Sequence, residues 1–511
     1  MTNDDTGSPQ RPRSPANMAS CCRAALAFGF STILFTSSIH AWSAAADEGV
    51  GFGTYTCAIV LGFILWGACV LSVASGITNY SGDCRRRTQQ NGRSVVVPIG
   101  LFVGTFAVVV LGESALHFGE AKAKCSGKAS SDLSPVVGTC AGHISAGFVY
   151  LIAAVFGVTA GWVGIAKRWN ESKSYGAGAV TLGVFLVSQS IYLFGAAGES
   201  GGGFPVVYSI VSGTVMLVGA VVIIFLGNKA TKMQMSSVGY GAMYLGTAVW
   251  LLAGAPIQSL SLPAAIEFPS AFRLFLAAAQ SSSSGTKMYI VEGVFVLASA
   301  FFMASAGAHA NKEYLGLSSP NGTRTSHAYT VLAFGLWLHA AFFRFVELAI
   351  DVPTGEGGQL ATYVLICILL CTGAAVCYTG AKMKHGGELE QYGGACYATV
   401  AVSVALYLLS STVYDGYDAS TSNGCGRSLS DSLSEDACYV RVFSSVVSLC
   451  GAVAVFVFTG IGFSRHKKAF SSGLSSRMDI EMAEEVAVRT RLNSDDNADD
   501  EVVSSSQIAV V

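Results

Sequence analysis

Long apolar runs are the feature that most constrains what this chain can fold into. A helix needs about 20 apolar residues to cross the ~30 Å hydrocarbon core of a bilayer. Backbone amides in lipid must be satisfied within one segment, and the alternating pattern of a membrane barrel strand is absent. The sequence therefore predicts an all-α polytopic bundle of about 12 helices. The expected spans are 24–43, 54–77, 95–118, 140–166, 175–197, 205–227, 236–256, 287–309, 327–350, 360–383, 391–414 and 439–463.

The composition agrees with a membrane protein and excludes several other classes. Hydrophobic residues make up 52% of the 511 residues, charged residues make up 12%, and the mean hydropathy is +0.52. A net charge of -2, without a basic cluster interleaved with aromatic residues, argues against nucleic acid as a partner. The sequence contains no phosphate-binding loop, no His-Glu-x-x-His pair and no Gly-x-Ser-x-Gly elbow. It therefore predicts no enzyme, no cofactor and no nucleotide-driven pump.

The distribution of basic residues predicts an orientation. Lysine and arginine concentrate in alternate loops, which places those loops and both termini in the cytoplasm. We expect a cytoplasmic N-terminal tail over 1–22, a membrane bundle over 23–463 and a disordered cytoplasmic tail over 464–511. The apolar residues at the end of that last tail are a candidate docking site for a cytoplasmic partner, and a plain solvated tail is the alternative. The segment from Met18 also resembles a secretory signal, with small residues before Asp47, so cleavage is the alternative for the first helix.

An internal repeat groups the predicted helices into hairpins. Odd-numbered helices end with similar segments, such as GESALHFGE and FFRFVELAID. Even-numbered helices end with a glycine followed by a basic step, as in VGIAKRW and FLGNKATK. Six such hairpins account for the whole membrane region. An apolar stretch from Ala271 to Ala279 is too short to span, and we expect it in the interface or at the mouth of a vestibule.

Two loops on the predicted non-cytoplasmic side each contain a pair of cysteines. Cys125 and Cys140 follow the third helix, and Cys425 and Cys438 follow the eleventh. Disulfides persist on that side of plasma and secretory-pathway membranes, so each pair is expected to close its own loop in one of those membranes. No second cysteine or histidine pair lies nearby at ligand spacing, so we expect no metal site.

Three other cysteines lie beside arginines at the predicted cytoplasmic edge of the membrane. Cys21, Cys22 and Cys84 are candidates for reversible palmitoylation, and ordinary packing is the alternative. The remaining cysteines lie mostly within apolar runs, where a small, soft side chain packs well.

Ionisable residues inside the apolar runs are the main functional signal. Arg344 and Glu347 are one helical i, i+3 step apart, and Glu113 and His117 are an i, i+4 pair. By the predicted topology, the charged helix residues all fall in the outer half of the membrane. Charges at that depth normally face a protein interior or a wet cavity, which predicts an outward-facing polar vestibule. Its candidate residues are Glu113, His117, Glu292, His339, Arg344 and Glu347.

These candidates have a functional and a structural interpretation. Glu292 and the other glutamates would respond to protons or cations, with Arg344 as an anion-facing group or as the counter-charge of Glu347. Alternatively, Arg344 and Glu347 snorkel to the headgroups or form a fixed structural pair. His339 can equally be a helix-contact histidine, and a protonated Glu292 a plain hydrogen-bond donor.

One stretch resembles a known family. The run YSIVSGTVMLVGAVVIIFLGNKATKMQMSSVGYGAMYLGTAVW is similar to the second-to-third-helix region of the acetate uptake transporter family, where a glycine-rich helix ends in Gly-Asn before a Ser-Tyr-Gly step. That family has six helices in hairpins, and its Asn-Pro signature before the first helix is missing here. The resemblance implies permeation of small monocarboxylates through a roughly doubled array of hairpins.

The sequence thus favours a transporter or channel for a small solute, embedded in the lipid bilayer and with no nucleic-acid partner. Its alternative is a non-transporting scaffold for membrane organisation or vesicle traffic. Three four-helix units of the MARVEL architecture, with cytoplasmic termini and cysteines in outer loops, would also make twelve helices. The oligomeric state is left open, a homo-oligomer included.

Overall fold

The structure, a computed structural model, describes most of the predicted membrane region. The described residues are 16–46, 52–85, 96–125, 140–167, 169–199, 203–255, 270–280, 285–312, 322–353, 356–385, 395–421 and 439–464. The predicted C-terminal tail, most of the predicted N-terminal tail, Cys425 and Cys438 lie outside these ranges.

The described residues form a bundle of 13 helices and contain no strand. Eleven of these helices are long and apolar enough to cross a membrane. The prediction of an all-α polytopic bundle is therefore confirmed. The helices are α1 Ala16–Ala46, α2 Phe52–Arg85, α3 Val96–Cys125, α4 Cys140–Ala166, α5 Glu171–Glu199, α6 Phe204–Met233, α7 Ser236–Ala253, α8 Ala271–Gln280, α9 Gly285–Ala310, α10 Gly322–Ile350, α11 Gly357–His385, α12 Ala395–Thr421 and a last helix, Tyr439–Ser464.

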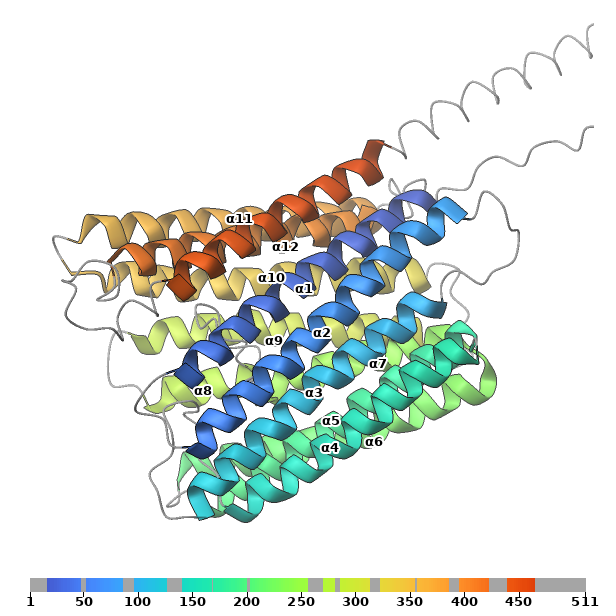
Figure 1. The fold of residues 1–511 in the computed structure, drawn as a ribbon, viewed down its shortest axis with the longest axis horizontal. Helices are drawn as coiled ribbons and strands as arrows, with labels where there is room; N and C mark the ends of the chain where they lie inside the picture. The colour runs from blue at the N-terminus through green and yellow to red at the C-terminus, as the bar shows by residue number, and fades with distance from the viewer. Residues whose placement is uncertain are drawn as a thin grey trace, which may run out of the picture.

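One of the two predicted disulfides is present and marks one end of the bundle. Cys125 at the end of α3 is bonded to Cys140 at the start of α4, with their Cα atoms 5.3 Å apart. We refer to this end, at the left in Figure 1 where α1 ends, as the disulfide end. The second predicted pair stays a prediction.

Removing this disulfide is expected to destabilise the protein. Closing a loop of 15 residues lowers the entropy of the unfolded chain, and the effect is about 3 kcal/mol in the chain-entropy model. A Cys125→Ser, Cys140→Ser double variant should therefore unfold at a lower temperature than the parent in the same detergent. Peptide mapping without reductant checks the bond itself, and free thiols at both positions would contradict it.

The helices alternate along the chain between two environments. α1, α3, α5, α7, α10 and α12 are the shielded helices, whereas α2, α4, α6, α9, α11 and the last helix are the exposed helices. Among the described residues, every exposed large hydrophobic side chain belongs to the exposed helices except Phe102, Phe194 and Ile350. The membrane windows of α3 and α5 are 67% buried, against 33% for α2 and α6. Each predicted hairpin thus pairs a shielded helix with an exposed one.

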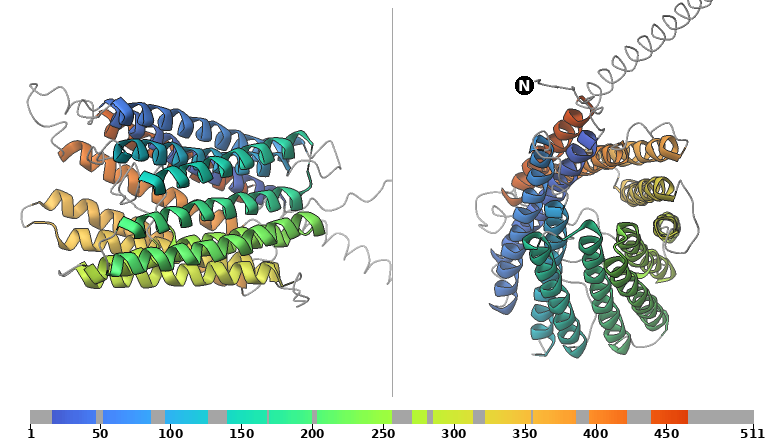
Figure 2. Two further views of the ribbon diagram at one scale, coloured as in Figure 1. Left: turned by 90° about the horizontal axis from the view of Figure 1, so that it is seen from below. Right: turned by 90° about the vertical axis from the view of Figure 1, so that its right-hand side faces the viewer.

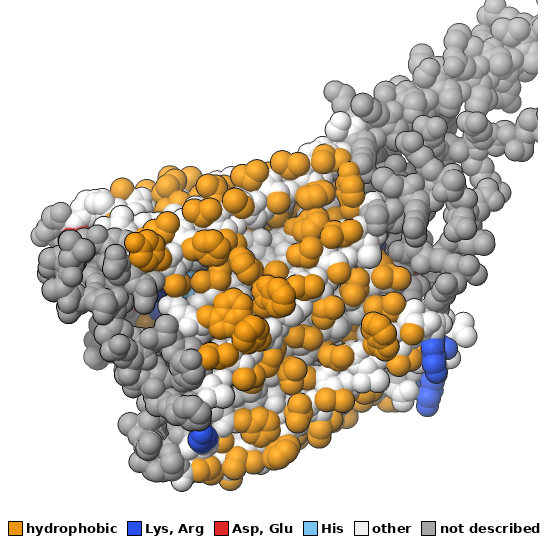
Figure 3. All heavy atoms as spheres, viewed as in Figure 1, with side chains coloured by type: hydrophobic (Ala, Val, Ile, Leu, Met, Phe, Trp, Pro, Cys, Tyr) orange, Lys and Arg blue, Asp and Glu red, His pale blue; other side chains and the backbone are white. Residues whose placement is uncertain are grey.

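The surface agrees with this arrangement. Figure 3 shows hydrophobic side chains across the middle of one face, with lysine and arginine only near its two ends. Such a belt is the surface that a bilayer requires. We conclude that the chain is a polytopic integral membrane protein, while its internal repeat stays a prediction.

The bundle closes because its first and last helices meet. Consecutive long helices pack side by side, and α1 also packs against α12 (Figures 1 and 2). Ala25 of α1, Ala405 of α12 and Val455 of the last helix share one core cluster. The ring of Phe28 stacks on Phe458 with centroids 4.7 Å apart. In this structure α1 is thus a component of the bundle. It begins at Ala16, before residue 23, where the membrane bundle was predicted to start.

Large side chains fill the middle of the bundle. Trp337 of α10 and Ile33 of α1 belong to one cluster, together with Trp250 of α7 and Tyr407 of α12. The Trp337 and Tyr407 ring centroids are 6.0 Å apart. Four shielded helices therefore meet through aromatic and aliphatic contacts, which corresponds to a closed arrangement.

The seventh predicted span differs from the others in length. α7 has 18 residues, about 27 Å at ~1.5 Å per residue, and it is not among the eleven candidate spans. It ends at Ala253 with Gly254 as its C-cap, and the Trp250 Nε1 donates a hydrogen bond to the carbonyl of Ala255 at 3.1 Å. α7 packs against α5, α6 and α9, and none of its residues is exposed. Because protein surrounds it, this helix does not need the hydropathy of a lipid-facing span.

The short helix α8 occupies the space beyond the end of α7. It packs against α6, α7 and α9, with Ala271 and Leu274 buried. Gly293 of α9 allows the approach, because a Cβ there would lie 2.7 Å from the Phe275 ring. The predicted non-spanning stretch is therefore a helix docked at the disulfide end.

Three glycine pairs hold neighbouring helices in close contact near the end opposite the disulfide. Each pair joins the two helices of one predicted hairpin. A Cβ on the second glycine of each pair would lie 2.7, 2.8 and 2.8 Å from the carbonyl oxygen of the first. Only glycine permits backbones to approach this closely. The pairs are Gly100 with Gly161, Gly176 with Gly227, and Gly241 with Gly307.

Candidate functional site

A cluster of ionisable and polar side chains is buried between α3, α4 and α5. None of its members is more than 7% exposed. We name it the α3–α5 polar cluster. It consists of Glu113 and His117 of α3, His143 and Tyr150 of α4, and Gln189 and Tyr192 of α5.

The two histidines lie at the centre of this cluster. The Nδ1 atoms of His117 and His143 are 3.0 Å apart, so one must carry a proton that the other accepts. The His117 ring stacks on Tyr150 and meets Tyr192 edge-on, both with centroids 5.0 Å apart. The aromatic rings enclose the imidazole pair and separate it from lipid.

Glu113 places a carboxyl group in the same enclosure. It is 1% exposed and interacts electrostatically with the fully buried Tyr150 hydroxyl. The backbone around it is fixed, because the Ser114 hydroxyl donates a hydrogen bond to the Gly147 carbonyl at 2.8 Å and joins α3 to α4. The site thus contains one carboxyl, two imidazoles and two phenols, and the carboxyl and the imidazoles are groups that can exchange protons.

The cluster lies in the half of the membrane-spanning region nearer the disulfide end. Glu113, Tyr150 and Gln189 are nine to ten residues from the disulfide-end limits of their spans. At ~1.5 Å per residue this is about 14 Å, whereas His117 and His143 are only five and three residues, or about 5–8 Å, from the same limits. The Gln189 Oε1 accepts a hydrogen bond from the Ala255 amide at 2.8 Å, which ties the cluster to the end of α7.

The sequence identified only part of this cluster. Glu113 and His117 were expected because they are an i, i+4 pair with a charge. His143, Gln189 and the two tyrosines were missed because they carry no fixed charge. The available signal was a histidine or glutamine within an apolar run, as in AGHISAGFVY and SQSIY.

The other predicted charged residues form a second group on α9 and α10. Arg344 Nη1 lies 3.4 Å from the Glu347 Oε2, which is the intrahelical pair that their spacing predicts. The Arg344 guanidinium also lies 5.4 Å from the Tyr289 ring centroid, and Glu292, 4% exposed, interacts with it electrostatically. The positive charge of Arg344 therefore faces the negative charges of two carboxylates, and its side chain is 39% exposed.

His339 lies in a different setting from its charged neighbours. Its ring stacks on Phe295 of α9, with centroids 4.8 Å apart and planes at 5°. The Tyr378 hydroxyl of α11 lies 3.3 Å from its Nδ1. This aromatic environment matches the helix-contact alternative.

The six predicted residues thus form two groups where a single vestibule was expected. α3 packs against α2, α4 and α5, while α9 and α10 pack against each other and against different neighbours. The sequence placed these residues at a similar depth but contained no information on their angular position around the bundle. A common depth was not sufficient to predict a common cavity.

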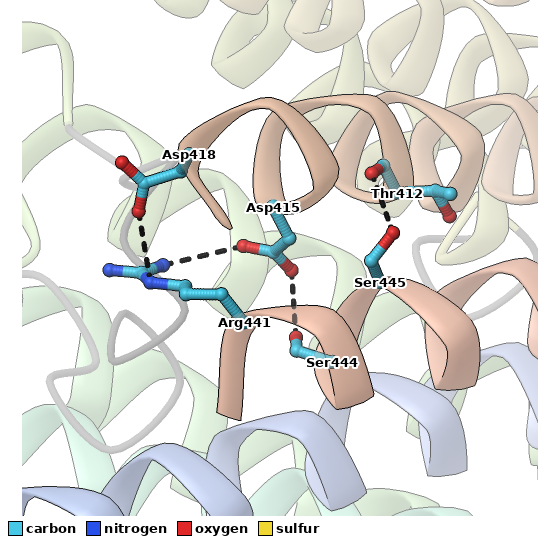
Figure 4. A network of polar contacts seen from close by, with 6 residues as sticks. All are labelled: Thr412, Asp415, Asp418, Arg441, Ser444 and Ser445. Carbon is cyan, nitrogen blue, oxygen red and sulfur yellow. Dashed lines mark hydrogen bonds and ion pairs between the residues drawn. The ribbon is translucent and has the colours of Figure 1, made fainter. Parts of the chain in front are cut away.

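A third charged group joins α12 to the last helix and was not predicted. Arg441 Nη1 lies 3.3 Å from Asp415 Oδ1, and Arg441 Nε lies 3.0 Å from Asp418 Oδ2. The Ser444 hydroxyl donates a hydrogen bond to Asp415 Oδ2 at 2.7 Å (Figure 4). Two aspartates three residues apart, in VYDGYD, followed by an arginine at the start of the next span were the available signal.

Removing the Arg441 charge should be costly, because Asp415 is only 2% exposed. Losing one partner of a buried pair costs about 3–5 kcal/mol, and the partial exposure of Arg441 lowers our expectation for Arg441→Gln to about 2–4 kcal/mol. The matched control is Asp418→Asn, which removes the more exposed pair with the same arginine and should cost about 0–1 kcal/mol. Thermal unfolding in one detergent compares the two, and equal losses would contradict the assignment.

The candidate palmitoylation sites differ in their surroundings. Cys21 and Cys22 of α1 are both 0% exposed, so acylation would require them to leave their packing. Cys84 lies in the last turn of α2, and its side chain lies outside the described part of the chain.

These groups define a polytopic membrane protein with ionisable side chains enclosed at the level of the bilayer. No protein-family model, curated protein or solved structure matches the chain. Within the described ranges, no three histidine, cysteine, aspartate or glutamate side chains are grouped so as to hold a metal ion.

Proposed function

We propose that this protein is a secondary transporter that couples the movement of a small solute to protons through the α3–α5 polar cluster. The observation that carries the proposal is the burial of Glu113, His117 and His143 in one enclosure, within the half of the membrane-spanning region nearer the disulfide end. Ionisable groups at this depth are expensive and usually mark ion or proton pathways. Histidine is the side chain that titrates closest to neutral pH, and glutamate and histidine together form proton relays in pumps and transporters.

Because the bundle is packed in its interior, transport requires a conformational change. Trp337 and its aromatic neighbours fill the centre, and the polar cluster is buried. A transport cycle must therefore expose the cluster to one side of the membrane at a time. The solute proposed is a small monocarboxylate, which the resemblance to acetate uptake transporters supports.

The proposed orientation places the disulfide end outside the cytoplasm. Disulfides persist in secretory and extracellular compartments. At the opposite end, Lys229 and Lys232 of α6 and Lys382 of α11 fit the cytoplasmic side. The proposed membrane is the plasma membrane or a membrane of the secretory pathway.

A flux assay tests this proposal. Purified protein in proteoliposomes is loaded with a pH-sensitive dye and offered labelled acetate, lactate, amino acids, sugars and monovalent cations in turn. We expect one solute class to enter with a matching proton signal. A failure of every class to cross, with and without an imposed pH gradient, would reject transport.

A scaffold is the second candidate, and the packed centre is the observation that favours it. Clusters that join α1, α7, α10 and α12 leave large side chains where a pathway would run. A scaffold predicts no flux for any solute, together with lateral assemblies that survive neutralisation of Glu113. Crosslinking of such assemblies in native membranes distinguishes it from the transporter.

A further inference from the structure

A pocket of about 500 Å³ lies at the disulfide end, between the start of α11 and the end of α12. Three tyrosines, two carboxylates and an amide line it together with two glycines. None of the six residues placed in the predicted vestibule lines it. The side chains used below are Glu356, Gln359, Tyr363, Tyr414, Tyr417 and Asp418.

The aromatic part of the pocket is held by its surroundings. Tyr363 is 8% exposed, and its hydroxyl accepts a hydrogen bond from Gln359 Nε2 at 3.1 Å. The Phe345 ring of α10 lies behind both Tyr363 and Tyr414, with centroids 6.0 and 6.3 Å away. The tyrosines therefore present a supported aromatic wall.

The charged part of the pocket is acidic. Glu356 and Asp418 supply carboxylates, and none of the lining residues is basic. Arg441 contacts Asp418 from the last helix, but the same guanidinium also binds Asp415. One cation is thus shared by two aspartates, and Glu356 adds a further negative charge.

We infer that this pocket binds a small organic cation through its trimethylammonium or related ammonium group. Tyrosine rings attract such groups by cation–π interaction, and nearby carboxylates add to the attraction. The amides at the start of α11 would favour an anion, but two carboxylates in the same pocket oppose one. The ammonium group can belong to a free solute or to the headgroup of phosphatidylcholine.

The test is a titration of full-length protein with choline as the probe. Ligand-observed NMR measures the binding. Its neutral control is 3,3-dimethyl-1-butanol, in which carbon replaces the ammonium nitrogen. Because Glu356 and Gly357 in the lining are exposed, we expect weak, millimolar binding of choline and at least about tenfold weaker binding of the alcohol. Equal binding of the two compounds, or no binding of choline, would overturn the proposal.

Two substitutions in the lining test whether choline binds in this pocket. Glu356→Gln and Tyr417→Leu should each raise the choline dissociation constant at least about fivefold. Asp351→Asn is the matched control, because Asp351 is an exposed acid close to the pocket that does not line it, and it should leave the constant unchanged. Glu356 is exposed, so its variant remains informative if the tyrosine variant misfolds. Unchanged binding in Glu356→Gln would refute the site.

Nanodiscs distinguish the two sources of the ammonium group. Weaker choline binding in phosphatidylcholine than in phosphatidylglycerol nanodiscs, compared at high salt so that the negative charge of phosphatidylglycerol is screened, assigns the pocket to the lipid headgroup. Equal binding assigns it to a free solute. The measurement does not depend on flux, so it tests this pocket independently of the proposed transport.

Discussion

Glu113→Gln is expected to reduce proton-coupled flux at least about 100-fold, the lower range for loss of a group that transfers protons. Glutamine keeps the shape of the side chain and its hydrogen-bonding capacity but cannot release a proton. The substitution therefore removes proton exchange from the enclosure that also contains His117 and His143. Solute uptake and internal pH, recorded together in proteoliposomes, measure the effect.

The control for this variant lies on the same helix. Glu120→Gln changes another buried carboxyl, 5% exposed and about two turns closer to the disulfide end. It should retain coupled flux if the effect is specific to the polar cluster. Glu113→Asp, which restores an ionisable group, should recover part of the activity. Full activity in Glu113→Gln would remove the cluster from the transport mechanism.

Gly161→Ala is expected to destabilise the protein by about 3 kcal/mol, the upper range for overpacking a well-packed contact. Its Cβ would lie 2.7 Å from the Gly100 carbonyl oxygen and 3.2 Å from the Gly104 amide nitrogen. Both neighbours are backbone atoms, which cannot rotate away as a side chain can. α3 and α4 must therefore separate to make room. Thermal unfolding in detergent should show the loss.

The same substitution in an open position provides the comparison. A Cβ at Gly67 of α2 would meet nothing within 4 Å. Because alanine is favoured over glycine in a helix by roughly 0.5–1 kcal/mol, Gly67→Ala should be neutral or slightly stabilising. Similar melting temperatures for the two alanine variants would show that the close approach of α3 and α4 does not contribute to the stability of the folded protein.

Local relationships were predictable from the sequence, whereas contacts between distant segments were not. The spans follow from hydropathy, and the Arg344–Glu347 pair follows from helical spacing. The Cys125–Cys140 bond joins two ends of one short loop. In contrast, the Asp415–Arg441 contact depends on how the last helix is rotated against α12. Hydropathy contains almost no information about that rotation.

The α3–α5 polar cluster shows the same limit. Depth along each helix placed Glu113 in the predicted outer half of the membrane, and it placed Glu292 in the same layer. Only packing separated them into different groups, because α3 and α9 have different neighbours. His143 and Gln189 were missed since uncharged polar residues are common in helical bundles and rarely stand out in a single sequence.

The modest length of α7 has a consequence for how this protein is made. α7 has 18 residues, and none of its side chains is exposed, so its surroundings in the folded protein consist of other helices. Its surroundings are supplied by α5 and α6, which are synthesised before it, and by α9, which follows. Assembly around α7 is therefore complete only after α9 has been synthesised, and truncation before α9 would leave α7 without a partner on one side.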